Sequence, residues 1–194
     1  MAVNLSKDLI GYLKNTLTSL PIVSINALSK TAIKKSYVPK KVLVPIGYQW
    51  VNVWWITKGV LRLYYIDKNG NEFNKAFFSE GELVFPVASL AQDKPSIFVI
   101  ETIEPVEVLE WKFKVFKNVF ERELLWEKFC LPFAQKLADV KFIREWEFLT
   151  LDARSRYERL KEQHPEIVNR LPDNMLASYI GITPVSLSRL KRNL

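Results

Sequence analysis

The amino-acid sequence predicts an α+β fold in which an antiparallel β-sandwich or barrel lies between helical segments at both ends. Before residue 36 and again after Lys112, apolar residues recur every three or four positions, which is helical periodicity. Between Val38 and Trp111 they alternate with period two, in short runs separated by turn signals. The chain of 194 residues is 48% hydrophobic, so it can bury a sizeable core.

The rare residue types exclude several kinds of site. The chain has one cysteine, Cys130, and one histidine, His164. An internal disulfide, a zinc ribbon, a four-cysteine iron–sulfur cluster and sites with several histidines are therefore excluded. We expect no metal, no cofactor and no catalytic residues.

Charge and hydropathy limit the partners and the location that we expect for the protein. The formal net charge of +7 favours an anionic partner such as nucleic acid. No apolar run approaches the roughly 20 residues of a membrane span, and residues 1–20 contain no signal-peptide core. We therefore expect a cytoplasmic protein with no membrane partner.

The first half of the chain divides into two helices and a series of strands. The spacing predicts helix over residues 5–36, broken at Pro21, with Ser24 capping a second helix that ends at Ile33. Six or more strands follow. Asn69-Gly70 gives the clearest hairpin signal, because both residues tolerate the positive φ of a tight turn.

A long central helix is predicted over residues 116–149. Pro132 lies inside it and predicts a kink or a restart near Leu131. An apolar stripe on this helix either packs against its own domain or forms the seam of a dimer. The stripe begins at Trp126, and its candidate dimer residues are Phe129, Phe133, Leu137, Val140 and Ile143.

The last 20 residues carry a helix-turn-helix pattern. Ala177 is small where two helices approach, and four residues later Gly181 allows a turn with positive φ. Thr183 can cap the second helix, with Pro184 in its first position. Apolar residues lie where such a motif buries them: Leu176, Ile180, Ile182, Leu187 and Leu190.

Hydroxyl and guanidinium groups dominate the rest of that second helix. Such groups suit contacts to DNA phosphates and base edges, and arginine is the commonest partner of guanine. The sequence therefore predicts contacts to double-stranded DNA by Thr183, Ser186, Ser188, Arg189, Lys191 and Arg192.

Three stretches resemble the Crp–Fnr family of bacterial transcription regulators: residues 56–64, residues 78–84 with Gly81-Glu82, and residues 177–192 in the form seen in Bacteroidetes-like members. The resemblance implies a β-roll (a double-stranded β-helix, jelly-roll-like) with helices over residues 1–115, a dimerisation helix over 116–149 and a helix-turn-helix domain over 150–194. It also implies a homodimer on a palindromic operator, with Arg189 contacting a base. The family's wing is expected to be absent or truncated, since the sequence stops at Leu194.

The cyclic-nucleotide cassette of the family is not matched. Its Gly-Glu-Leu element should fall at Phe85-Pro86-Val87 and its arginine at Ser96-Ile97, so Pro86 and Ser96 replace the two ligands. A buried phosphate without a guanidinium partner is unfavourable. We expect that cyclic AMP does not bind in the family manner, and that any effector is of another kind.

Six positions remain candidates for lining an effector pocket, unless the roll serves only as a scaffold: Arg62, Tyr64, Phe85, Pro86, Ser96 and Ile97. Arg62 lies in phase with Tyr64 on a predicted strand. It either stands at the mouth of a pocket or pairs with a surface carboxylate.

A homodimeric DNA-binding transcription regulator is thus the leading prediction. The alternatives are a cupin-like enzyme or small-molecule-binding protein with a structural helical tail, and a basic adaptor for membrane surfaces. The basic stretch over residues 30–41 has no assigned role; a solvated loop and a helper in steering DNA are both open.

Overall fold

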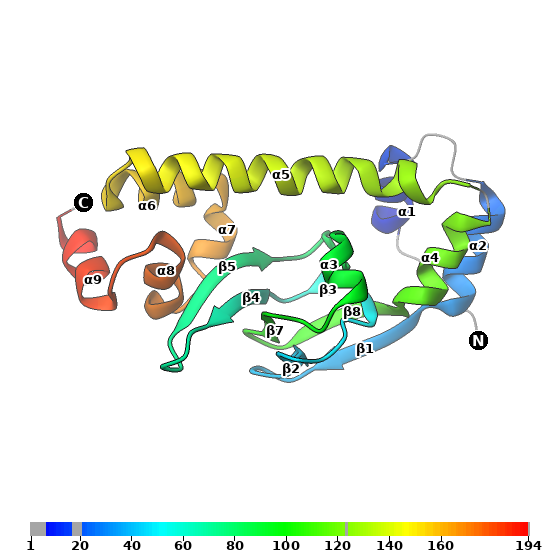
Figure 1. The fold of residues 1–194 in the computed structure, drawn as a ribbon, viewed down its shortest axis with the longest axis horizontal. Helices are drawn as coiled ribbons and strands as arrows, with labels where there is room; N and C mark the ends of the chain where they lie inside the picture. Colours follow the sequence, from blue (N-terminus) through cyan, green and yellow to red (C-terminus); the bar gives the residue numbers. More distant parts are fainter. Residues whose placement is uncertain (1–6, 17–20, 123, 194) are drawn as a thin grey trace.

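The computed structural model describes residues 7–16, 21–122 and 124–193. Two short helices, α1 (Lys7–Thr16) and α2 (Ile22–Thr31), precede a β-roll. The chain then leaves the roll through α4 (Phe113–Glu121) and α5 (Trp126–Thr150), and ends in a group of small helices. Figure 1 shows α5 running along one side of the molecule, with α2 and α4 near one end and α8 and α9 near the other.

Within these residues the roll consists of two four-stranded antiparallel sheets, ordered β1-β8-β3-β6 and β2-β7-β4-β5. The predicted fold class is confirmed. The strands are β1 (Ile33–Tyr37), β2 (Val42–Val44), β3 (Asn52–Lys58), β4 (Leu61–Ile66), β5 (Glu72–Phe78), β6 (Leu83–Val84), β7 (Val99–Thr102) and β8 (Val106–Lys112), and α3 (Ser89–Asp93) follows β6.

The two faces of the first sheet are buried in different cores, because side chains alternate along each strand. One face packs against the second sheet through residues such as Trp54, Ile56 and Val108. The other face packs against α1, α2, α4 and the start of α5 through Trp55, Trp111 and their neighbours. Aromatic side chains therefore fill the roll and the helical layer beside it.

The hairpin between β4 and β5 matches the sequence prediction. Gly70 has a φ of 83°. The Asp67 carboxylate accepts hydrogen bonds from the backbone N–H groups of Asn69 (2.8 Å) and Asn71 (2.9 Å). This Asp side chain fixes the loop in the way expected of a turn residue.

The predicted start of the chain needs two corrections. Ser24 is buried inside α2 and does not cap it; Pro21 precedes the helix in an extended conformation. The second helix ends at Thr31 instead of Ile33, and Ile33–Tyr37 is strand β1. Pairing with β8 decides this conformation, a contact that local helical spacing cannot register.

The predicted helix over residues 116–149 is two helices. The first helix, α4, ends at Glu121 and α5 begins at Trp126, and Leu124 between them has a φ of 56°. Pro132 lies inside α5, which continues through it without the restart predicted near Leu131. The helical segment is therefore interrupted near Leu124, a residue in the left-handed conformation, and not at Pro132.

The remaining helices are α6 (Ala153–Gln163), α7 (Pro165–Val168), α8 (Asp173–Ile180) and α9 (Pro184–Arg192). Their apolar side chains form a third core with Val60 of the roll. This core includes Tyr157, Leu160, Leu176 and Leu187.

Candidate functional site

The turn between α8 and α9 has the geometry that the sequence predicts. Gly181 lies in the left-handed region (φ 76°, ψ 37°). Its N–H donates to the carbonyl of Ser178 (3.3 Å), and the N–H of Ile182 donates to the carbonyl of Ala177 (3.0 Å). These two bonds form a Schellman motif, which satisfies the last carbonyls of α8 and turns the chain into α9.

The start of α9 is capped by Thr183. The threonine Oγ1 accepts from the backbone N–H of Ser186 (3.1 Å), and Pro184 occupies the first helical position. Ala177 and Leu187 are fully buried between the helices. The predicted helix-turn-helix is therefore present, with its predicted cap, turn and interior.

The outer face of α9 is basic and free. Because Leu187 points inward, helical spacing places Val185, Ser188, Arg189 and Arg192 on the opposite side, and all four are exposed. Within the described part of the chain, the side chains of Arg189 and Arg192 form no hydrogen bond or ion pair. Their guanidinium groups are available to a ligand outside the protomer.

The other predicted contact residues are engaged within the chain. Lys191 pairs with Asp173 at the start of α8, and its ammonium lies 5.8 Å from the centre of the Tyr157 ring. The hydroxyls of Thr183 and Ser186 lie 2.9 Å apart as part of the cap. Arg189, Arg192 and Ser188 are thus the predicted contacts that the fold leaves most available.

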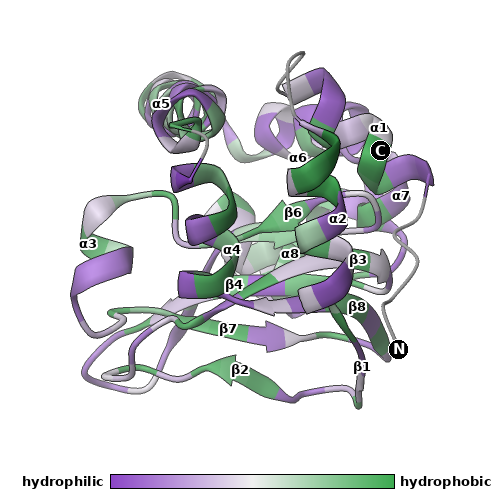
Figure 2. Ribbon diagram, turned by 90° about the vertical axis from the view of Figure 1, so that its right-hand side faces the viewer, coloured by the Kyte–Doolittle hydropathy of each residue, from purple (hydrophilic) through white to green (hydrophobic). Residues whose placement is uncertain are grey.

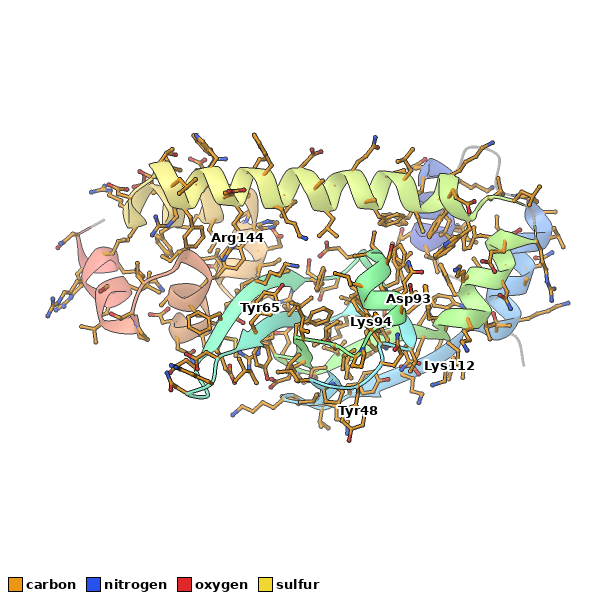
Figure 3. All side chains as sticks on the ribbon, viewed as in Figure 1. Tyr48, Tyr65, Asp93, Lys94, Lys112 and Arg144 are labelled. Carbon is orange, nitrogen blue, oxygen red and sulfur yellow. The ribbon has the colours of Figure 1, made fainter. Side chains whose placement is uncertain are left out.

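The helix-turn-helix is fixed to the edge of the roll by a contact that the sequence analysis missed. The Ser178 hydroxyl accepts from the N–H of Asn74 (2.9 Å) and donates to the carbonyl of Glu72 (2.9 Å), so α8 covers the outer edge of β5. Arg144 of α5, labelled in Figure 3, donates to the carbonyls of Asn74 (3.3 Å) and Tyr179 (2.7 Å). No local pattern marks these residues, because each acts across more than 30 positions of sequence.

A second link joins the small helices to the roll. Arg170 donates to both carboxylate oxygens of Glu80 (2.8 Å each) and also bonds Glu104. The guanidinium of Arg170 lowers the pKa of Glu80 to about 2. Arg170 follows α7, whereas Glu80 and Glu104 belong to turns of the roll. These ion pairs therefore connect the C-terminal helices to the roll.

Arg62 and Tyr64, predicted for a pocket, form a closed polar cluster on β4. The guanidinium of Arg62 pairs with Glu101 (2.9 Å) and Glu72 (2.5 Å) and lies 3.9 Å from the centre of the Tyr64 ring. The Tyr64 hydroxyl donates to Glu101 (2.8 Å), and burial raises the pKa of that hydroxyl above its usual value. The predicted pairing of Arg62 with a carboxylate is confirmed, although the pair with Glu101 is buried.

The four cassette positions lie in different environments. Phe85 packs in the aromatic core, 4.9 Å from the ring of Phe133 and 5.8 Å from that of Phe129, and Pro86 beside it is buried. The Ser96 hydroxyl donates to the carbonyl of Phe98 (2.7 Å). Ile97 is 72% exposed.

The predicted dimer stripe is split between two environments. Phe129 is fully buried and stacks on Phe120 at 4.2 Å, and Phe133 packs beside it. Leu137 is half-buried, whereas Val140 and Ile143 are exposed. The first two residues belong to the core of the protomer and are not available to a second copy.

Another row of α5 side chains is exposed on the opposite face. Leu131 is 56% exposed, Phe142 is 75% exposed and Leu149 is 78% exposed, and Ala138 lies between the first two. Their spacing of seven, four and seven residues keeps them on one side of the helix. Figure 2, which looks nearly along α5, shows hydrophobic residues on more than one side of this helix.

Among residues 7–16, 21–122 and 124–193, no group of three or more His, Cys, Asp or Glu side chains is placed to hold a metal ion. In the same part of the chain, none of the helices is both long and apolar enough to cross a membrane.

Comparison with known proteins identifies the fold. No protein-family model and no curated protein matches the sequence. Among solved structures, FixK2 from Bradyrhizobium japonicum is similar with a TM-score of 0.75 at 15% identity, over 84% of each chain. The global regulator CLP from Xanthomonas campestris has a TM-score of 0.69 at 13% identity, over 89% of this chain and 91% of that one.

A structure from Eubacterium rectale, described as a transcriptional regulator of the Crp/Fnr family, has a TM-score of 0.66 at 13% identity. It covers 92% of this chain, which spans 87% of that one. CLP and the Eubacterium rectale protein are both described as regulators. The chain has the fold of the Crp/Fnr transcription regulators, with a cyclic-nucleotide-binding type of β-roll, a long helix and a C-terminal helix-turn-helix.

Proposed function

We propose that the protein is a homodimeric transcription regulator that reads a palindromic DNA operator with α9. The free basic face of α9, with Arg189 and Arg192 unpaired beside Ser188, carries this proposal. A helix presented in this way fits the major groove, and an arginine there recognises guanine by two hydrogen bonds. The fold shared with Crp/Fnr regulators supports the same function.

Selection of bound sequences from random duplexes tests the proposal. A two-fold symmetric site should be enriched, with half-sites about one helical turn apart. Absence of any enriched sequence would contradict a sequence-specific reader.

Arg189→Ala tests the reading helix itself. We expect this variant to lose about 1–3 kcal/mol of discrimination at one base pair of the selected site, because a bidentate contact is removed. Electrophoretic mobility shift with the parent site and single-base variants measures the loss. Arg122→Ala is the matched control, since Arg122 is exposed and directly follows α4, which lies at the other end of the molecule from α9 (Figure 1). Equal losses in the two variants would remove Arg189 from the reading role.

The roll of this regulator is proposed not to bind cyclic AMP. By sequence spacing, Phe85 and Pro86 correspond to the family's ribose-binding element, but Phe85 packs against Phe133 in the aromatic core. The Ser96 hydroxyl donates within its own loop, to the carbonyl of Phe98. The cation nearest to Ser96 in sequence, Lys94, is exposed and offers a point charge in place of a bidentate fork. Isothermal titration calorimetry should detect no binding at millimolar cyclic AMP; a saturable heat would refute this part. The roll either binds another small molecule or serves as a scaffold. In both cases the proposed DNA contacts are made by α9.

We further propose that the dimer forms through the outer face of α5, defined by Leu131, Ala138, Phe142 and Leu149. The inner face of the helix is occupied by the protomer's own core in its first two turns, whereas this row stays exposed along the helix. A second copy of the same helix would bury it symmetrically.

A further inference from the structure

The β-roll has one five-residue sheet edge, strand β1, that no described element of the chain pairs with from outside. Of the four edge strands within the described residues, β5 is covered by α8, β6 has two residues and β2 has three. Strand β1, Ile33–Tyr37, has five and lies at the margin of its sheet (Figures 1 and 2). An edge of this length is unusual unless it is protected or used.

The outward backbone of β1 has free hydrogen-bonding groups. The strand pairs only with β8, in a continuous antiparallel register from Ile33 opposite Glu110 to Tyr37 opposite Val106. No other backbone hydrogen bond reaches residues 33–37 from the described part of the chain. Since alternate residues of a strand direct their N–H and C=O groups to opposite sides, this edge can accept a further strand.

Positive charge is concentrated along the same edge. Residues 30–41 contain five lysines and no acidic residue, so this stretch supplies +5 of the net charge of +7. Lys35 lies 3.7 Å from the Glu110 carboxylate. In the described structure, the side chains of Lys34, Lys40 and Lys41 form no ion pair and are exposed.

The turn after β1 holds two of these lysines in fixed positions. Lys40 has a φ of 60°, a conformation that is unfavourable for a residue with a side chain and is retained where the surroundings enforce it. The buried Thr102 enforces it here, because the N–H groups of Lys40 and Lys41 donate to its carbonyl and hydroxyl oxygens (2.8 Å each). The same hydroxyl donates to the carbonyl of Val38 (2.7 Å).

Apolar side chains stand exposed between the lysines. Ile33 is 55% exposed and Val38 is 69% exposed. A site for an added strand needs this combination, because the main chain supplies hydrogen bonds while alternate side chains supply specificity.

We propose that the β1 edge binds an extended acidic segment of a partner protein, which adds as a strand beside Ile33–Tyr37 and places its carboxylates near Lys34, Lys40 and Lys41. A second copy of this chain is disfavoured on this edge, since lysines would face lysines. DNA phosphates could satisfy the charges and would leave the strand's N–H and C=O groups unused. This interaction is separate from operator reading by α9.

Fluorescence anisotropy with the full chain and a labelled peptide of alternating valine and glutamate tests the proposal. We expect saturable binding that weakens as salt is raised. The same peptide with lysine in place of glutamate should not bind. A version with every amide N-methylated keeps the charges and removes the strand's donors, and it should also fail to bind.

Charge reversal on the protein completes the test. Lys34→Glu should weaken binding of the acidic peptide about three- to tenfold. Lys68→Glu, in the exposed β4–β5 hairpin, is the matched control and should change nothing. Equal binding of the N-methylated peptide, or no effect of Lys34→Glu, would overturn strand addition. A third result would also overturn it: the parent chain binds no peptide, and the Lys34→Thr variant self-associates. The lysines would then serve only to prevent pairing between copies of the chain.

Discussion

Position 181 is constrained both by its backbone and by its neighbour. The φ of 76° is one that side chains rarely adopt, and a Cβ there would lie 2.5 Å from Cε1 of Phe148. The guanidinium groups of Arg144 and Arg156 both lie 4.8 Å from the centre of the Phe148 ring, so a shift of the ring would disturb these two contacts. The turn predicted from the sequence is therefore also a packing contact between α5 and the helix-turn-helix.

Gly181→Ala is expected to destabilise the fold by about 1–3 kcal/mol, the cost of a left-handed side chain, plus a further loss from the clash. Gly70→Ala is the matched control, because Gly70 has a similar φ of 83° and open space around a Cβ. Urea unfolding of both variants measures the two costs. Equal losses would show that the Phe148 contact adds nothing.

Helix α5 carries apolar residues on two faces, and this explains the partial failure of the stripe predicted from spacing. The predicted stripe is real, but its first residues, Phe129 and Phe133, pack against the aromatic core of the same protomer. The exposed row on the outer face was hidden in the sequence because a helix apolar on two sides has no single preferred face. Only the position of α5 beside the roll distinguishes the two faces.

Two substitutions on neighbouring positions separate the faces of α5. Phe142→Glu should convert a dimer to a monomer, since it places a charge in the proposed outer seam. Val140→Glu, on the inner face and 47% exposed, should leave the dimer intact. Sedimentation equilibrium measures the association, and circular dichroism checks that both protomers stay folded. Dissociation by Val140→Glu alone would place the seam on the inner face.

At the scale of the whole molecule, the orientation of the helix-turn-helix depends on contacts with the roll. Ser178 and Arg144 join it to the edge of β5, and Arg170 joins it to Glu80 and Glu104. Because the second link is ionic and partly exposed, it weakens with salt and with acid.

Acid should release the link between Arg170 and Glu80. The arginine lowers the pKa of Glu80 from 4.5 to about 2, so the charged carboxylate is favoured in the folded state. Its stabilising contribution is fully present above pH 4.5 and is lost as the pH falls toward 2. Urea unfolding should find the parent more stable than Glu80→Gln at neutral pH, with the difference shrinking over that range.

Glu158→Gln is the control for the acid experiment. Glu158 pairs with Arg154 one turn away on α6, and such exposed helical pairs contribute about 0.3–0.5 kcal/mol. Its effect should be small at every pH. A difference between parent and Glu80→Gln that stays constant down to pH 2 would contradict the assigned role of the Arg170 link.

The sequence by itself determined the α+β class, the β4–β5 hairpin and the helix-turn-helix. These features depend on local chemistry: Gly70 and Gly181 permit positive φ, Thr183 caps, and Pro184 suits a first helical position. The tertiary structure alone decided that residues 33–37 form an edge strand, that α5 starts at Trp126, and that Arg189 is free while Lys191 is paired. Each of these outcomes depends on partners distant in sequence, such as β8 for β1 and Asp173 for Lys191, so no local pattern could specify them.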